Sequence, residues 1–95
     1  MTPSIHVADN PDEHRYDVFV DGEPAGFAEY RDEPGRRVFV HTEVDDRFEG
    51  QGVGGRLARA ALDDVRRRGL AVVPECPFIR SWIEHHPDYA DLVAA

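Results

Sequence analysis

Apolar and polar residues follow two different periods along the chain, and the change falls near residue 44. Before it, short runs alternate between apolar and polar positions, which is the period of a β-strand with one buried face. These runs predict strands at residues 15–20, 25–30 and 37–44, with a shorter strand at 4–7. The sequences Asp21-Gly22 and Glu33-Pro34-Gly35 are typical of tight turns. The first half of the chain therefore predicts an antiparallel meander.

The run at 37–44 has the most regular alternation of the three. Its residues are expected to divide between two faces, with Val38, Val40, Thr42 and Val44 on one and Phe39, His41 and Glu43 on the other. This division places the side chains of His41 and Glu43 on the same side of the strand.

After residue 44 the apolar positions follow the period of a helix. One amphipathic helix is predicted from the spacing of Val53, Leu57, Ala60, Ala61 and Val65, and Gly69 ends it. Residues 70–73 form an apolar run typical of a buried strand. A second helix starts at Pro77 and ends before Pro87. It is expected to bury Phe78, Ile79, Trp82 and Ile83, with Tyr89, Leu92 and Val93 folding back onto the body.

The order of these elements predicts the fold class. A strand, a helix and a further strand at 37–73 should form a right-handed crossover, so that the strands at 37–44 and 70–73 are parallel neighbours. The prediction is an α+β fold with a mixed sheet, in which an antiparallel meander is joined to this parallel pair, and with two main helices. Its 95 residues are expected to form a single domain, 1–95.

Composition narrows the classes of function. A net charge of -8 argues against binding to nucleic acid or to anionic membranes, and it favours attraction of a cationic amine. All the basic residues other than histidine are arginines, so Schiff-base chemistry and P-loop phosphate binding, which need lysine, are excluded. Cys76 is the single cysteine, and the N-terminus lacks the pattern of a signal peptide. We therefore expect a cytoplasmic protein.

The glycine-rich stretch at residues 47–55 lies between a strand and an amphipathic helix. Glycines there let the backbone curve around a ligand, and the helix N-terminus adds a partial positive charge, so we expect an anion to bind. A P-loop would need a lysine, and a dinucleotide fold would need this turn after its first strand. The pyrophosphate of coenzyme A is the third interpretation.

With this turn, the sequence resembles the GNAT superfamily of N-acetyltransferases over residues 16–93, which implies acetyl-CoA as the acyl donor. The family signature [Q/R]-x-x-G-x-[G/A] matches literally from Arg47, and a second register, aligned on the following helix, begins at Glu49 and departs from the signature at that residue. We prefer the second, because it places Leu57 as the first large apolar residue of the helix. The resemblance implies that Val44 contacts the thioester arm through its backbone. It also implies that coenzyme pyrophosphate binds to backbone amides of Gln51, Gly52, Val53, Gly54 and Gly55.

More narrowly, the chain is similar to small, truncated GNAT-like domains with a Pro-x-Cys-Pro-Phe turn. The residues that carry this resemblance are His41-Thr42-Glu43-Val44 and Pro74-Glu75-Cys76-Pro77-Phe78. Full-size members have two helices between their first and second strands, next to the acceptor site, whereas this chain has only a turn at 10–14. The acceptor side should therefore be open, or completed by another molecule, which leaves a homo-oligomer as one alternative.

Three residues are candidates for the chemistry. Glu43, at the end of its strand, is the best candidate base for the acceptor amine, with a solvated strand-end glutamate as the alternative. His41 on the same face could relay the proton, or it is a structural histidine. Cys76 follows the strand at 70–73 and is either a small buried residue, an acyl-carrying nucleophile or the acid for the leaving thiolate. The tyrosine that many family members use as this acid is replaced here by Ile83.

Other polar groups carry weaker expectations. His85 and His86 point apart on a helix and lack a metal-ligand spacing, so we expect no metal site. The arginines at 66–68 are expected on the outer face and last turn of the first helix, with contact to the adenosine 3′-phosphate as the alternative. The leading hypothesis is an acetyl-CoA-dependent N-acetyltransferase acting on an unidentified amine. Its rivals are a non-catalytic acyl-CoA-binding module of the same fold and an interaction domain without a coenzyme.

Overall fold

The computed structural model describes residues 3–94. One five-stranded sheet has the strand order β1-β2-β3-β4-β5. The strands are β1 (Ile5–Asn10), β2 (Arg15–Val20), β3 (Glu23–Glu33), β4 (Arg36–Val44) and β5 (Ala71–Pro74). The helices are α1 (Val53–Arg67) and α2 (Pro77–Glu84), with the 3-10 turns η1 (Pro11–Glu13), η2 (Asp46–Phe48) and η3 (Pro87–Leu92).

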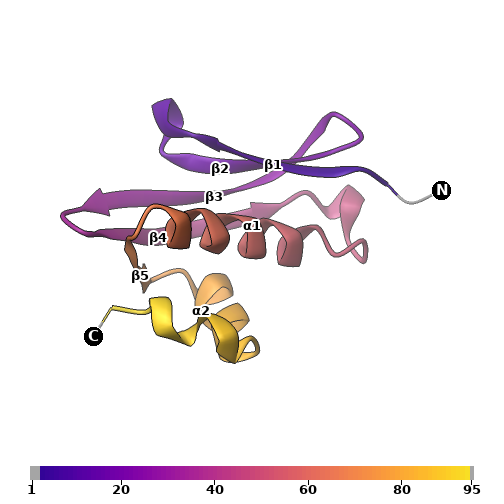
Figure 1. Cartoon of the computed structure of the whole chain (residues 1–95). Helices are drawn as coiled ribbons and strands as arrows, with labels where there is room; N and C mark the ends of the chain where they lie inside the picture. Colours follow the sequence, from indigo (N-terminus) through magenta and orange to yellow (C-terminus); the bar gives the residue numbers. More distant parts are fainter. Residues whose placement is uncertain (1–2, 95) are drawn as a thin grey trace.

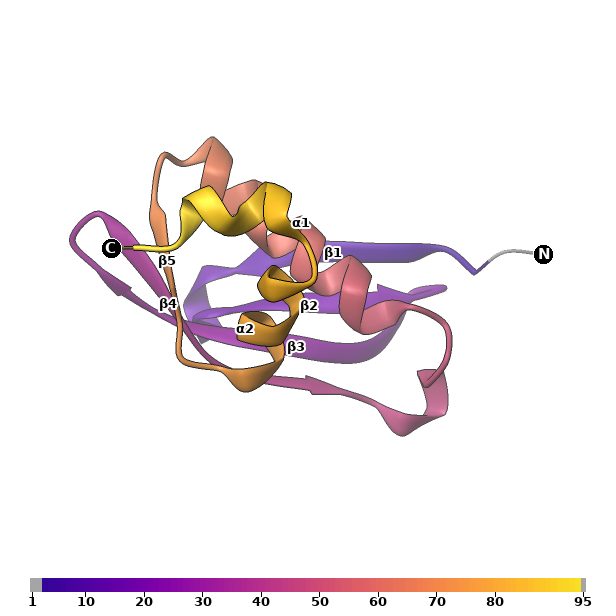
Figure 2. The ribbon, with the colours of Figure 1, turned by 90° about the horizontal axis from the view of Figure 1, so that it is seen from below.

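The topology confirms the predicted α+β, GNAT-like arrangement. Strands β1 to β4 pair antiparallel in chain order, and β4 pairs parallel with β5 after the crossover through α1. Figure 1 shows the antiparallel strands above the β4–β5 pair, with α1 crossing the sheet. Seen from below, α1, α2 and the C-terminal η3 all lie on one face of the sheet (Figure 2). The other face carries no helix among residues 3–94. Neither α1 nor α2 is long and apolar enough to span a membrane.

A single apolar core fills the space between the sheet and the two helices. It contains Tyr16, Val18 and Phe39 from the strands, Leu57, Ala58, Ala61, Leu62 and Val65 from α1, and Ile79, Trp82 and Ile83 from α2. The predicted stripes of both helices are confirmed, except at two positions. Ala60 lies at the edge of the stripe, and Phe78, predicted to be buried, is 39% exposed. In a helix of only two turns, the periodicity does not settle whether the first residues are buried or exposed. Phe78 lies at the boundary between the buried and the exposed face.

The N-terminal strand is longer than predicted. It extends to Asn10, which pairs with Arg15 across the short turn η1 instead of belonging to the turn. The hairpin at Asp21-Gly22 is confirmed, with positive φ angles of 50° and 83° that match the right-handed twist of the flanking strands. The C-terminus folds back as expected, since Tyr89 and Leu92 are buried and the amide of Ala94 donates to the carbonyl of Val72 at 2.8 Å.

A β-bulge in β4 makes the predicted alternation of this strand wrong. On β3 Glu29 and Tyr30 are consecutive, but their partners on β4 are His41 and Phe39, so Val40 is an extra residue. Because of the bulge, the β4 side chains after Val40 point to the opposite face of the sheet from the one predicted. Phe39 therefore shares the helix-covered face with Thr42 and Val44, while His41 and Glu43 lie on the helix-free face.

Candidate functional site

Strands β4 and β5 separate halfway along β4. Their pairing runs only from Arg36 and Ala71 to Phe39 and Pro74. The amide of Cys76 donates to the carbonyl of Phe39 at 2.9 Å, after which the chain turns away into α2. Residues 41–44 of β4 are therefore paired only with β3, and the other edge of residues 40–44 is open over this part of the described chain.

The backbone of Val44 faces this open edge. The amide of Asp45 donates to the carbonyl of Ala25 on β3 at 2.7 Å. Because successive residues of a strand direct their amide and carbonyl groups to opposite sides, those of Val44 point away from β3. Within residues 3–94, Val44 thus presents a donor and an acceptor without recorded backbone partners where the resemblance implies contact with the thioester arm, and the contact itself stays a prediction.

The glycine-rich turn leads from β4 into the N-terminus of α1. Gly50 and Gly52 have positive φ angles of 83° and 75°, and Gly52 is the N-cap of α1 without a side-chain cap. The first amide of α1 with an internal partner is that of Arg56, which donates to the carbonyl of Gly52 at 3.1 Å. Within residues 3–94 no acceptor is recorded for the amides of 53–55, so these three are available to an anion. Gln51 differs, because its amide already donates to the carbonyl of Phe48.

Two of the glycines also have a packing role that sequence reasoning missed. A Cβ atom on Gly54 would lie 2.9 Å from Cζ of Phe78, and one on Gly55 would lie 3.7 Å from Nε1 of Trp82. The absence of side chains there lets α2 approach the first turn of α1. This contact brings the free amides of α1 close to the start of α2 and hence to the point where β4 and β5 separate.

Cys76 lies at that point of separation. Its side chain is 3% exposed, and its Sγ donates to Oγ1 of Thr42 at 3.3 Å. Thr42 belongs to the open part of β4, so the thiol is next to the strand edge that Val44 also lines. The structure thus places Cys76 on the helix-covered side of the sheet.

His41 and Glu43 lie together on the opposite side. Nε2 of His41 is 3.2 Å from Oε1 of Glu43, and both side chains are more than half exposed. The ring of Phe27, the partner of Glu43 on β3, is 6.1 Å from the His41 ring between centroids. The three predicted catalytic residues therefore form a pair on one face and a single thiol on the other, with the backbone of β4 between them.

A hollow of about 610 Å³ lies next to Glu43 on the helix-free side. Asp17, Phe27 and Glu43 form a row across β2, β3 and β4 along its floor. Its remaining walls include Arg15, Phe19, Pro24, Val44, Asp45 and Asp46. The hollow contains both aromatic surface and carboxylates, and no local sequence pattern predicts it because its residues come from three strands and a turn.

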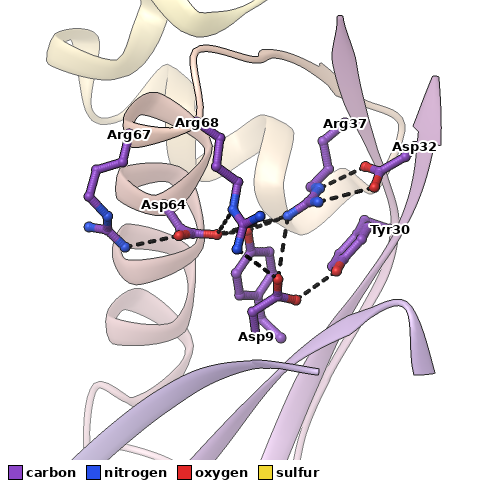
Figure 3. Close-up of polar contacts among 8 residues, drawn as sticks. Asp9, Tyr30, Asp32, Arg37, Asp64, Arg67 and Arg68 are labelled. Atoms are coloured by element: carbon purple, nitrogen blue, oxygen red, sulfur yellow. Dashed lines mark hydrogen bonds and ion pairs between the residues drawn. The ribbon is translucent and has the colours of Figure 1, made fainter. Parts of the chain in front are cut away.

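A buried polar network occupies the other end of the sheet (Figure 3). Arg37 is 5% exposed and donates to both carboxylate oxygens of Asp32, at 2.7 and 3.1 Å, and to the hydroxyl of Tyr16 at 2.7 Å. Tyr16 in turn donates to Asp64 of α1 at 2.6 Å. Burial and the bond to Asp64 raise the pKa of Tyr16 well above its usual range. Arg68 bridges Asp64 and Asp9, at 2.7 and 3.2 Å.

These charges are matched within the network, which therefore holds α1 to the sheet. Burial acts to raise the pKa of Asp64, but hydrogen bonds from Tyr16 and Arg68 outweigh it and lower that pKa. The arginine run is engaged at this C-terminal end of α1, with Arg66 bonded to Asp91 at 2.8 Å and Arg67 to Asp64 at 3.0 Å. They lie at the opposite end of α1 from the glycine turn, and the alternative contact with an adenosine 3′-phosphate stays a prediction.

The histidines at the end of α2 contact their own helix. Nδ1 of His85 is 2.8 Å from the carbonyl of Ser81, and Nδ1 of His86 is 2.7 Å from that of Trp82. In the described part of the chain, no three residues among histidine, cysteine, aspartate and glutamate are grouped to hold a metal ion.

Known proteins similar to this chain point to one family. The sequence model described as GCN5-related N-acetyl-transferase matches residues 15–92. The protein called NATD1 is 36% identical over 55 residues in Homo sapiens and in Gallus gallus, a match that covers 56% of this chain. It covers 49% of the human and 50% of the chicken protein, so the chain spans about half the length of the curated relatives it matches.

Two solved structures share the fold. A GCN5-like protein from Staphylococcus aureus superimposes with a TM-score of 0.73 at 23% identity, covering 95% of this chain and 88% of that one. A ribosomal-protein-alanine N-acetyltransferase from Brucella melitensis biovar Abortus has a TM-score of 0.61 at 20% identity, covering 100% and 93% of the two chains. At these identities the likeness establishes the architecture and leaves the substrate open.

Proposed function

Because the chain belongs to the GCN5-related N-acetyl-transferase family, we propose that it transfers the acetyl group of acetyl-CoA to an amine. One observation carries the proposal: the free amides of 53–55 and the open edge of β4 meet at the same end of the sheet. A pyrophosphate and an extended acyl arm need these two features together, because amides at a helix N-terminus bind anions and a free strand edge hydrogen-bonds an amide-containing chain.

The coenzyme is held mainly by the backbone in this proposal. The amides of Val53, Gly54 and Gly55 bind the pyrophosphate, and Gly52 lets the chain turn without a side chain in the way, since nothing lies within 4 Å of a Cβ built there. The thioester arm runs along residues 40–44 toward Val44 and Cys76. Phe78, exposed beside Gly54, covers the arm from the side of α2.

The acceptor approaches from the helix-free face, where Glu43 and His41 lie. Glu43 takes a proton from the ammonium group, directly or through His41, and the free amine attacks the thioester carbonyl carbon. The C–N bond forms, the attached nitrogen releases its second proton to solvent, the C–S bond breaks, and the leaving thiolate takes a proton from Cys76, which is re-protonated from solvent. We assign this role to Cys76 because Ile83, at the position of the family's acidic tyrosine, has no proton to donate, and the hydroxyl of Tyr89 already donates to Asp63 at 2.6 Å.

Calorimetric titration with acetyl-CoA, followed by an amine-acetylation assay on the same protein, tests the proposal. Micromolar to submillimolar binding, with release of free coenzyme A thiol that depends on added amine, is the expected result. Absence of binding at millimolar acetyl-CoA would refute the proposal and leave the interaction-domain alternative.

A second candidate function is a non-catalytic acyl-CoA-binding module. The engagement of Tyr89 with Asp63 and the apolar side chain of Ile83 favour it, because the family's usual acid is then missing from the site. Binding of acetyl-CoA without any amine-dependent thiol release, across a broad set of amines, would select this alternative over the enzyme.

A further inference from the structure

The hollow on the helix-free face has the composition of a site for a particular kind of amine. We propose that it binds a small-molecule aryl-alkyl ammonium, with the aryl group on Phe27 and the cation near Asp46. The proposal rests on the proposed function, since it names the acceptor class of that same reaction. Phe27 and Asp46 both line the hollow, as does the proposed base Glu43.

Aromatic surface makes up part of its floor. Phe27 is half-buried, and the turn end of the β2–β3 hairpin adds Phe19 and Pro24 beside it. The guanidinium of Arg15 lies 4.9 Å from the centre of the Phe27 ring and already covers part of that ring surface. A ligand with an apolar ring would be desolvated against the aromatic carbon of Phe27 and Phe19 that stays accessible beside it.

Carboxylates make the hollow selective for cations. Four of them line it, namely Asp17, Glu43, Asp45 and Asp46, against the single guanidinium of Arg15. Two of the four are already matched, because Asp17 pairs with Arg15 at 2.8 Å and Asp45 pairs with Arg47 at 3.1 Å. Within residues 3–94 no ion pair with arginine is recorded for Glu43 or Asp46. Unmatched negative charge beside aromatic surface attracts an ammonium group and repels a carboxylate.

The two unmatched carboxylates have different tasks. Asp46 follows β4 in η2, and it contributes attraction for the cation as it enters. Glu43, at 3.2 Å from His41, then removes the proton that must leave before nitrogen can attack the thioester. A volume of about 610 Å³ matches a drug-sized or smaller ligand. The acceptor in this proposal is therefore a small-molecule amine and not an amine on a protein.

A set of probes that differ in one property each tests this assignment. The full chain, labelled with ¹⁵N, is titrated with phenethylamine, 2-phenylethanol, ethylamine and 3-phenylpropionate, and amide shifts are followed by NMR. We expect phenethylamine to bind at least about tenfold more tightly than the other three. Ethylamine lacks the aromatic ring, 2-phenylethanol lacks the charge, and 3-phenylpropionate has a negative charge in place of the positive one. The largest shifts should fall at Phe19, Phe27 and Asp46. Equal affinity for phenylpropionate, or shifts outside the hollow, would overturn the proposal.

Two variants and a control separate the roles of ring and charge. Asp46→Asn should weaken phenethylamine binding about fivefold to tenfold and leave 2-phenylethanol unchanged, whereas Phe27→Leu should weaken both. Asp12→Asn, an exposed substitution in η1, serves as the matched control and should change neither. Unchanged amide spectra outside the hollow show that each variant is folded. If Asp46→Asn weakens the alcohol as much as the amine, the assignment of charge selection to Asp46 is wrong.

Coenzyme binding distinguishes failure of this inference from failure of the proposed function. Acetyl-CoA contacts α1 and the edge of β4 in our proposal, so its affinity should be the same in wild type, Asp46→Asn and Phe27→Leu. Normal acetyl-CoA binding without phenethylamine binding would contradict the acceptor assignment and leave the proposed function standing. Tighter binding of a lysine-containing peptide than of phenethylamine would replace the small molecule by a protein acceptor.

Discussion

Gly54 lies against the ring of Phe78, so close that a Cβ on the glycine would come within 2.9 Å of Cζ. The pair joins the first turn of α1 to the first turn of α2 and sets the width of the site between them. Because Phe78 is 39% exposed, its ring can swing outward when the glycine is replaced. Replacing Gly54 should therefore change the shape of the site more than it changes the free energy of unfolding.

A double-mutant cycle should measure this contact. Gly54→Ala gains up to about 1 kcal/mol of helix propensity, and displacement of the Phe78 ring offsets that gain in the wild-type background. In a Phe78→Ala background the same substitution should stabilise by about 0.5–1 kcal/mol, as measured by urea unfolding. Equal effects of Gly54→Ala in the two backgrounds would show that the ring and the glycine are energetically independent.

Gly52 offers a sharper test of anion binding. Its φ angle is 75°, a conformation that asparagine and aspartate adopt more readily than other residues, and a side chain there enters open space. Asp and Asn have the same shape, so Gly52→Asp and Gly52→Asn impose the same strain and differ only in charge. We expect acetyl-CoA to bind at least about tenfold more weakly to the aspartate variant than to the asparagine variant. This difference in affinity should become smaller at high salt. Calorimetric affinities that agree between the two variants would place the pyrophosphate elsewhere.

Asp64 gives a pH dependence whose sign is fixed by its lowered pKa. A carboxyl group with a folded pKa below its unfolded value contributes stability that is fully present above about pH 5 and is lost as the pH falls through the folded pKa. Asp64→Asn should therefore cost about 1–3 kcal/mol at neutral pH, and the difference from wild type should shrink below about pH 4. Urea unfolding at a series of pH values measures it, with Asp12→Asn as a control for general acid effects. A gap that stays constant down to pH 3 contradicts the assignment.

Most of the fold could be predicted from the sequence because its signals are local. Asp21-Gly22 fixes the hairpin through two residues that tolerate positive φ, and the apolar stripe that includes Leu57 and Val65 fixes the inner face of α1. The register of β4 against β3 is a different matter. An alternating run such as 37–44 looks the same with or without a bulge, and only the pairing of Glu29 with His41 and of Tyr30 with Phe39 reveals the extra residue.

The site shows the same division between local and long-range information. Val44, Cys76 and the free amides of α1 follow from the order of strand, turn and helix, which the sequence displays. The separation of Glu43 and Cys76 onto two faces of the sheet depends on the bulge, and the hollow at Phe27 depends on three neighbouring strands. Nothing in the strand pattern at 37–44 indicates that Arg37 is buried, because its burial beside Tyr16 and Tyr30 results from tertiary packing.

If Glu43 is the base, its loss should be visible in the rate and in its pH dependence. Glu43→Gln should lower kcat about 100-fold near neutral pH while leaving the KM for acetyl-CoA unchanged. The deficit should shrink at higher pH, because the acceptor amine is then deprotonated in solution. Glu33→Gln, at the last residue of β3 and at the opposite end of that strand from the site, is the control and should behave as wild type. A kcat for Glu43→Gln within twofold of wild type at all pH values would remove Glu43 from the mechanism.

The two chemical roles open to Cys76 predict different products. An acyl carrier would release coenzyme A before any amine is added and would gain an acetyl group, whereas a proton donor would do neither. The structure favours the donor, since the thiol is 3% exposed and directs its hydrogen to Thr42 at 3.3 Å. We therefore expect intact-protein mass spectrometry of an acid-quenched mixture with acetyl-CoA to show no acetyl group on Cys76 above the level found in denatured protein.

Cys76→Ala should then retain acetyl-CoA binding and lose about tenfold to 100-fold in kcat, because water must protonate the leaving thiolate. Thr42→Val removes the partner of the thiol without removing its proton, so its kcat should fall less than that of Cys76→Ala. Rapid, stoichiometric acetylation of Cys76 in the folded protein, followed by transfer to the amine, would assign the carrier role instead. Full activity of Cys76→Ala would leave Cys76 as a small buried residue that closes the junction of β4 and β5.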